Sequence, residues 1–132
     1  MASIFTRIVA GEIPCYKVAE TDDYLAFLDI RPQVKGHTLC IPKREIDYIF
    51  DLDDDYLGGL MVFSKKVAKA VRAVVPCARI GVSVIGLEVP HAHVHLLPIS
   101  QLADMTFKPT PIAVPPEEME ALRGAIAARV EL

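Results

Sequence analysis

Histidine occupies every second position of one short apolar run, at His91, His93 and His95. These are three of the four histidines in the chain. The alternation predicts a β-strand over residues 91–99 in which the three imidazoles share one face and the intervening residues point into the core. Histidine changes charge near neutral pH, so three of them in a row indicate a site that handles phosphate or protons.

Covalent catalysis is one chemistry that such a row supports. A neutral imidazole is a good nucleophile toward phosphorus when a hydrogen-bond acceptor holds its other nitrogen. His93 is the best-placed candidate, because it has an imidazole on each side. His91 and His95 would then orient it or bind phosphate oxygens, which meets the charge on the transferred group. A phosphohistidine intermediate would split one displacement into two in-line steps.

Two other interpretations of the histidine row stay open. Histidines two positions apart can share a metal ion, but three along a straight strand span about 13 Å at ~3.3 Å per residue. One ion would therefore bind only two of them, and the sequence offers no clustered cysteines or carboxylates to complete a site. We therefore predict no metal. The second interpretation is a purely structural row.

Length and composition limit the classes of protein to which the chain can belong. Its 132 residues, 52% hydrophobic and 23% charged, predict one globular domain over residues 1–132 and argue against disorder. A net charge of −3 does not favour binding to nucleic acid. No run of about 18 apolar residues is present, so we expect no transmembrane helix and no membrane partner.

The cysteine pattern indicates the compartment. Cys15, Cys40 and Cys77 are odd in number and show no Cys-x-x-Cys spacing, which predicts reduced thiols and a cytoplasmic protein. The N-terminus lacks a basic segment followed by an apolar stretch, so we expect no signal peptide.

Hydrophobic periodicity and turn residues predict the elements around the histidine run. Apolar residues at three- and four-residue steps predict a long helix that begins at Asp53–Asp55 and ends before Pro76. Pro115–Glu118 opens a last helix, and the proline-rich segment Thr106–Val114 is predicted to be an extended edge or loop. The layout is α+β, an antiparallel sheet with helices packed on it. Further strands are predicted over residues 16–18, 24–28, 37–41 and 79–85.

The run His91–Leu97 resembles the signature of the histidine triad (HIT) family, in which His-x-His-x-His is followed by two apolar residues. Four further blocks are similar to the Hint-like branch of that family, which contains purine-nucleotide phosphoramidases. They occur in the family's order and roughly its spacing, and the resemblance covers residues 3 to about 100. The blocks are Ser3–Ile8, Gly11–Pro14, Ala26–Pro32 and Gly36–Lys43.

The resemblance implies a HIT-like fold with one long helix and a C-terminal helix, and a homodimer in which two copies form one continuous sheet. It implies that the protein binds a purine nucleotide like AMP, and no cofactor is expected. The family's middle histidine becomes nucleotidylated and maps to His93. The last histidine contacts phosphate and maps to His95, while the first orients the nucleophile and maps to His91. An upstream histidine of the family's relay maps to His37.

A nucleotide-binding set also follows from the resemblance. Asp29 maps to the carboxylate that holds the ribose hydroxyls in the family, and a carboxylate that accepts from two hydroxyls makes strong hydrogen bonds. An aspartate before a turn is the plainer interpretation of the same residue. Apolar side chains of the first segments enclose the base in the family, although such residues also suit an ordinary core. They map to Phe5, Ile8, Ile13, Phe27 and Ile30.

Two segments depart from the family pattern. Some members hold a structural zinc ion with Cys-x-x-Cys near the N-terminus, but these positions are Ser3 and Thr6 here, so we expect no such zinc. The loop before the histidine run is shorter and more apolar than in many members, with Leu87 where glutamine is usual. Glu88 in this loop is a candidate acceptor for a cationic amine leaving group, unless it is simply a solvated turn residue.

Two classes of function follow. The first is an enzyme, a purine nucleoside phosphoramidase that releases AMP through a nucleotidyl-histidine intermediate on His93. Hydrolysis of dinucleoside polyphosphates is the alternative within that class, and a metal-dependent hydrolase is a weaker one. The second class is a nucleotide-binding module with little turnover. Release of AMP that is lost in a His93→Ala variant separates the enzyme from the binding module.

Overall fold

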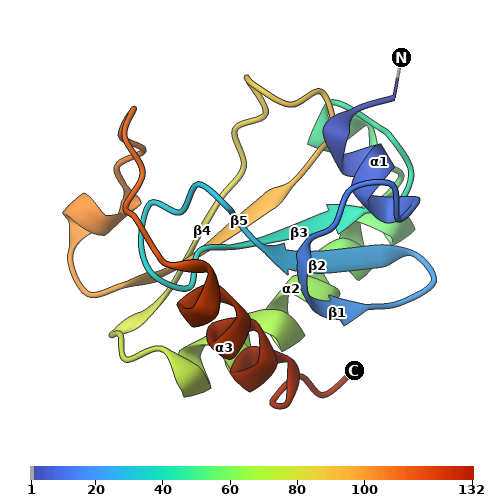
Figure 1. Cartoon of the computed structure of the whole chain (residues 1–132). Coiled ribbons are helices and arrows are strands. Elements are labelled where there is room, and N and C mark those ends of the chain that lie inside the picture. Colours follow the sequence, from blue (N-terminus) through green and yellow to red (C-terminus); the bar gives the residue numbers. More distant parts are fainter. Residues whose placement is uncertain (1) are drawn as a thin grey trace.

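The computed structural model describes residues 2–132, whose centre is a five-stranded antiparallel sheet in the order β1-β2-β3-β5-β4 (Figure 1). The strands are β1 (Tyr16–Glu20), β2 (Tyr24–Leu28), β3 (Thr38–Pro42), β4 (Arg79–Ser83) and β5 (Val94–Ile99). The helices are α1 (Ile4–Val9), α2 (Asp54–Val74) and α3 (Pro116–Ala127), with short 3-10 turns at η1 (Ile49–Asp51) and η2 (Leu102–Met105). The predicted α+β fold class is confirmed.

The long helix α2 begins and ends where its sequence signals predict. The Asp53 carboxylate accepts a hydrogen bond from the Tyr56 N–H at 2.8 Å, and two more acidic residues lie in the first turn, where the helix dipole favours negative charge. The helix ends at Val74, two residues before Pro76. Its buried face carries apolar residues at three- and four-residue steps, as predicted, including Leu60, Phe63, Val67 and Val71.

The sheet is apolar on both faces, and the two faces pack against different helices. Residues that pair directly across antiparallel strands share a face. One face carries Ala26, Leu28, Cys40, Val94 and Leu96, which join α2 and α3 in the larger core. The opposite face carries Leu25, Phe27, Leu39 and Ile41, which pack against Phe5 of α1. The predicted site residue Phe27 lies on this second face.

The predicted strand over residues 91–99 is wrong at its start. Strand β5 begins only at Val94, so His91 and His93 lie in the irregular segment before it. The reason is a different set of backbone partners: the His91 N–H donates to the Val89 carbonyl at 2.8 Å, and the Ala92 N–H donates to the Ile46 carbonyl at 2.7 Å. The alternation nevertheless holds, since Ala92, like Val94, is buried in the larger core.

Other boundaries differ by one or two residues. Strand β1 extends two residues beyond its prediction, β4 is two residues shorter, and β3 starts and ends one residue later. Residues 106–114 form no strand; the Ile112 N–H donates to the Pro32 carbonyl at 2.9 Å and so ties this segment to the loop before β3. Among residues 2–132, no helix is both long enough and apolar enough to cross a membrane.

Candidate active site around four histidines

A cavity of about 630 Å³ opens on the α1 face of the sheet. The sheet places the histidines there, because His95 pairs with Leu39 and therefore shares a face with Phe27. Three of the four predicted catalytic histidines and all of the predicted nucleotide-binding residues line this cavity. They are His37, His93, His95, Phe5, Ile8, Ile13, Phe27, Asp29, Ile30 and Glu88.

His93 has its two ring nitrogens in different surroundings. Nδ1 lies 2.7 Å from the backbone carbonyl oxygen of His91. A carbonyl oxygen only accepts hydrogen bonds, so Nδ1 carries the proton. Nε2 of His93 is then left with a free lone pair beside the cavity. This is the arrangement that a nucleophilic imidazole requires.

The side chain of His91 is fully buried and is not part of the cavity lining. Its Nε2 donates to the Pro42 carbonyl at 2.8 Å, so Nδ1 accepts from the Ser3 hydroxyl at 2.9 Å. Burial lowers the pKa of this imidazole. The contact that holds His93 thus comes from the His91 main chain, while the His91 ring anchors that main chain.

The positions that carry Cys-x-x-Cys in some relatives form a hydrogen-bonded network here. The Thr6 hydroxyl donates to Glu45 at 2.7 Å, and the backbone N–H of Ser3 donates to the same carboxylate. Zn²⁺ binds cysteine, histidine and carboxylate ligands rather than hydroxyls. The Ser3 and Thr6 hydroxyls therefore do not fit the two cysteine positions of a structural zinc site, and Nδ1 of His91 already accepts from Ser3.

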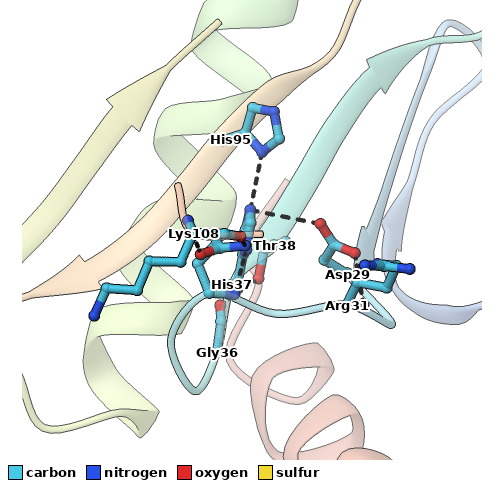
Figure 2. A network of polar contacts seen from close by, with 8 residues as sticks. Asp29, Arg31, Gly36, His37, Thr38, His95 and Lys108 are labelled. Carbon is cyan, nitrogen blue, oxygen red and sulfur yellow. Dashed lines mark hydrogen bonds and ion pairs between the residues drawn. The ribbon is translucent and has the colours of Figure 1, made fainter. Parts of the chain in front are cut away.

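His37 and His95 form a directed hydrogen-bond chain. The backbone N–H of Gln33 donates to Nδ1 of His37 at 3.1 Å, so the proton of the neutral His37 ring resides on Nε2. That Nε2 lies 2.9 Å from Nδ1 of His95 and donates to it (Figure 2). The neutral His95 ring must therefore carry its own proton on Nε2, which makes it a hydrogen-bond donor.

Burial keeps this pair of rings neutral. Burial first, and then the neighbouring His93 imidazole, lower the pKa of His37 from 6.5 to about 4 and that of His95 to about 3. Asp29 lies with one carboxylate oxygen 3.7 Å from Nε2 of His37, and the other accepts from the Arg31 N–H at 2.9 Å. Burial raises the pKa of the Asp29 carboxyl.

Asp29, His37 and His95 bring three potential metal ligands within 4.8 Å of one another. Tetrahedral zinc with Zn–N distances of about 2.0–2.1 Å keeps its nitrogen ligands more than 3 Å apart. The two imidazole nitrogens are 2.9 Å apart and have a proton between them. The geometry is that of a hydrogen bond rather than of a metal centre.

The apolar part of the cavity lies around Phe5. Its ring packs edge to face against Phe27 and His93, with centroids 5.6 Å and 5.0 Å apart. Ile8 and Ile13 are half-buried beside it. Ile30, by contrast, is 73% exposed, so it lies at the rim.

The short loop before the histidine run forms another wall. Leu87 is 89% exposed and Glu88 is also exposed. Residues 85–87 and His93 also line a second cavity of about 530 Å³, whose other walls are mostly apolar and include Phe50 and Met61. This places His93 at the junction of two cavities.

Sequence reasoning missed several residues of the site, and three of them contribute to the arguments below. Gln33 fixes the His37 ring, and Phe107 and Lys108, from the segment after η2, also line the cavity. Phe107 is an aromatic residue within a proline-rich extended segment, and that is the one local signal that could have singled it out. Its contact with His95 depends on tertiary packing.

The structure is a small α+β domain whose cavity is lined by three histidines, with the fourth, His91, buried behind them. A family model of the HIT domain matches residues 10–102 of the chain. The chain therefore belongs to the HIT domain family, and the membership that the histidine run predicted is confirmed.

Similar proteins include two yeast enzymes. The chain is 48% identical over 71 residues, 54% of this chain and 53% of the relative, to adenosine 5'-monophosphoramidase hnt1 of Schizosaccharomyces pombe. It is 38% identical over 98 residues, 74% of this chain and 62% of the relative, to adenosine 5'-monophosphoramidase HNT1 of Saccharomyces cerevisiae. The matches thus span a little over half the length of these enzymes.

Solved structures support the same fold. A Hit-like protein from Bartonella henselae, involved in cell-cycle regulation and solved with an unknown ligand, is similar to this chain with a TM-score of 0.83 and 32% sequence identity. The similarity covers 96% of this chain and 95% of that protein.

Proposed function

We propose that this protein is a purine nucleoside phosphoramidase that releases AMP from adenosine 5'-phosphoramidates. The observation that carries the proposal is the 2.7 Å contact between Nδ1 of His93 and the His91 carbonyl, which leaves Nε2 as a nucleophile beside a cavity of nucleotide size. The names of the yeast relatives support the choice of substrate.

The reaction proceeds in two displacements at phosphorus. In the first, Nε2 of His93 bonds to phosphorus, the P–N bond breaks, and the amine leaves with a proton from water. In the second, a hydroxide oxygen bonds to phosphorus, the bond to Nε2 breaks, and AMP is released. The net reaction consumes one water molecule, and His93 returns to its starting form.

The other site residues bind and stabilise the nucleotide. The Nε2–H of His95 donates to a phosphate oxygen, where negative charge develops during each displacement. Asp29 accepts from the ribose hydroxyls, and the apolar residues around Phe5 enclose the base. Glu88, at the rim, accepts hydrogen bonds from an amine leaving group.

The proposal is tested by mixing the protein with adenosine 5'-phosphoramidate and measuring AMP release. His93→Ala should abolish release, and mass spectrometry of the acid-quenched parent protein should find AMP on His93. Although His93 is buried, it lines a cavity, so the variant should keep its far-UV circular dichroism spectrum. Equal turnover by variant and parent would overturn the assignment. Tight AMP binding without turnover would identify a binding module instead.

We also propose that two copies pair along β4. This strand ends the sheet, so its outer backbone groups lack a partner strand within residues 2–132. Exposed apolar residues accompany it, namely Val82, Val84, Met61 and Val62. Light scattering should give twice the monomer mass, and Val82→Lys should give the monomer mass. A monomeric parent protein would reject this pairing.

We further place the protein in the cytoplasm. All three cysteines are free thiols, as a reducing compartment maintains them. Fractionation of cells that express the chain with a tag tests this assignment.

A further inference from the structure

The segment after η2 reaches back across the cavity and covers two of the histidines. The Phe107 ring packs edge to face against His95, with centroids 4.9 Å apart and planes at 78°. It meets His37 in the same way, at 5.8 Å and 82°. One apolar ring therefore covers both members of the hydrogen-bonded pair.

Gln33 fastens this segment to the loop that carries His37. Its side-chain amide donates to the Lys108 carbonyl at 3.0 Å, and its side-chain oxygen accepts from the Lys108 N–H at 2.7 Å. Its own backbone N–H donates to Nδ1 of His37. Gln33 therefore connects the covering segment with the hydrogen bond that fixes the His37 tautomer. We call Gln33, Phe107 and the Lys108 backbone the clasp.

The clasp has a physical consequence for both rings. An aromatic ring packed against an imidazole excludes water, and loss of water disfavours the charged form. A fixed donor at Nδ1 of His37 also prevents that nitrogen from carrying the proton of the neutral ring. Loosening the clasp would therefore admit water and release the tautomer at the same time.

We propose that the clasp holds the His37–His95 pair in the single hydrogen-bonded arrangement that presents the Nε2–H of His95 to the substrate phosphate. Gln33 and Phe107 are then positioning residues, because they act through the two histidines. The assignment to phosphate rests on the proposed function. The effect of the clasp on the two rings does not, so the two are tested separately.

Few charges lie near the pair, and none of them is removed when the clasp is altered. Asp29 faces His37 at 3.7 Å, and the His93 ring lies 4.8 Å from His95 between centroids. Arg31 lies on the same loop as Asp29, and the Lys108 side chain runs away from both imidazoles (Figure 2). Gln33 and Phe107 are uncharged, so replacing them leaves all four of these groups unchanged.

The primary experiment follows the histidine rings by ¹⁵N nuclear magnetic resonance as a function of pH, without substrate. In the parent protein His37 and His95 should stay neutral with Nε2 protonated down to about pH 4. Phe107→Ala should raise both titration midpoints by about one pH unit. Gln33→Ala should shift them in the same direction and mix the His37 tautomers. Thr110→Ala, an exposed change farther along the same segment, should match the parent.

The outcomes are decisive with or without enzymatic activity. Unchanged midpoints and tautomers in both clasp variants would overturn the inference. If Phe107→Ala does not fold, the Gln33→Ala spectra decide alone, since that change opens no apolar gap. Where the protein turns over adenosine phosphoramidate, each clasp variant should lower kcat about tenfold while KM changes little. A change confined to KM would reject the positioning role even if the ring titrations shift.

Discussion

The Nδ1 atom of His93 lies 2.7 Å from the carbonyl oxygen of His91, two positions earlier in the chain. That carbonyl cannot easily turn away, because the His91 ring is held between Pro42 and Ser3. The direction in which His93 presents its free nitrogen is therefore set by the backbone before β5 rather than by a neighbouring side chain.

The hydrogen-bond partners predict an individual tautomer for each histidine. His93 should carry its proton on Nδ1, whereas His37, His91 and His95 should each carry theirs on Nε2. The ¹⁵N chemical shifts of the ring nitrogens at pH 7.5 distinguish these forms. His93 protonated on Nε2 would contradict its assignment as the nucleophile, because the lone pair would then face a carbonyl.

Asp29→Ala should weaken substrate binding more than it slows turnover. A carboxylate that accepts from ribose hydroxyls is worth about 1.5–3 kcal/mol, so KM should rise about 10- to 100-fold while kcat changes less. Steady-state kinetics on adenosine 5'-phosphoramidate measure this. The control is the 2',3'-dideoxy analogue, on which parent and variant should be alike. An equal loss on both substrates would show that Asp29 does not contact the ribose.

Local patterns in the sequence predicted the elements because they depend on near neighbours. The apolar steps of α2, the acidic residues at its start and the alternation of His93, Val94 and His95 are visible within a few residues. The predicted start of β5 is wrong because the Ala92 N–H donates to the Ile46 carbonyl in a distant loop. The residues around position 92 contain no sequence signal for that hydrogen bond.

The supporting contacts of the site join distant parts of the chain. Ser3 meets His91 across 88 positions, and Gln33 meets Lys108 across 75. Such contacts form only when the sheet and the loops have packed, so they cannot be predicted from hydrophobic periodicity or turn residues. The resemblance to the HIT family predicted that His37 belongs to the site, but no comparable pattern predicted a role for Phe107.

The free energy of unfolding should fall as the pH drops below about 6.5. His37 and His95 have pKa values of about 4 and about 3 in the folded protein, and near 6.5 when unfolded. The unfolded chain thus binds more protons between these limits, so stability rises with pH there, by up to about 1.4 kcal/mol per pH unit for each ring. The raised pKa of Asp29 acts in the opposite direction at lower pH.

Urea titrations between pH 4 and pH 8 measure this dependence. His37→Gln should reduce the slope below pH 6.5, because one of the two titrating rings is gone. His95 is still present and His91 also has a lowered pKa, so part of the slope should remain in that variant. Stability that is flat from pH 7 to pH 4.5 in the parent would show that the buried rings do not titrate as the structure requires.

Gly36→Ala should destabilise the protein and disturb His37 next to it. The backbone φ of Gly36 is +88°, an angle that residues other than glycine rarely adopt. A Cβ added at this position would lie 2.8 Å from Cγ2 of Val75. The backbone strain alone costs about 1–3 kcal/mol, and relief of the contact would shift the loop before β3.

Gly58→Ala is the matched control. Gly58 lies within α2, and no atom lies within 4 Å of the added Cβ, so this substitution should stabilise the protein by about 0.5–1 kcal/mol. Urea unfolding measures both changes, and a Gly36→Ala variant as stable as the parent would show that the turn before His37 relaxes without cost.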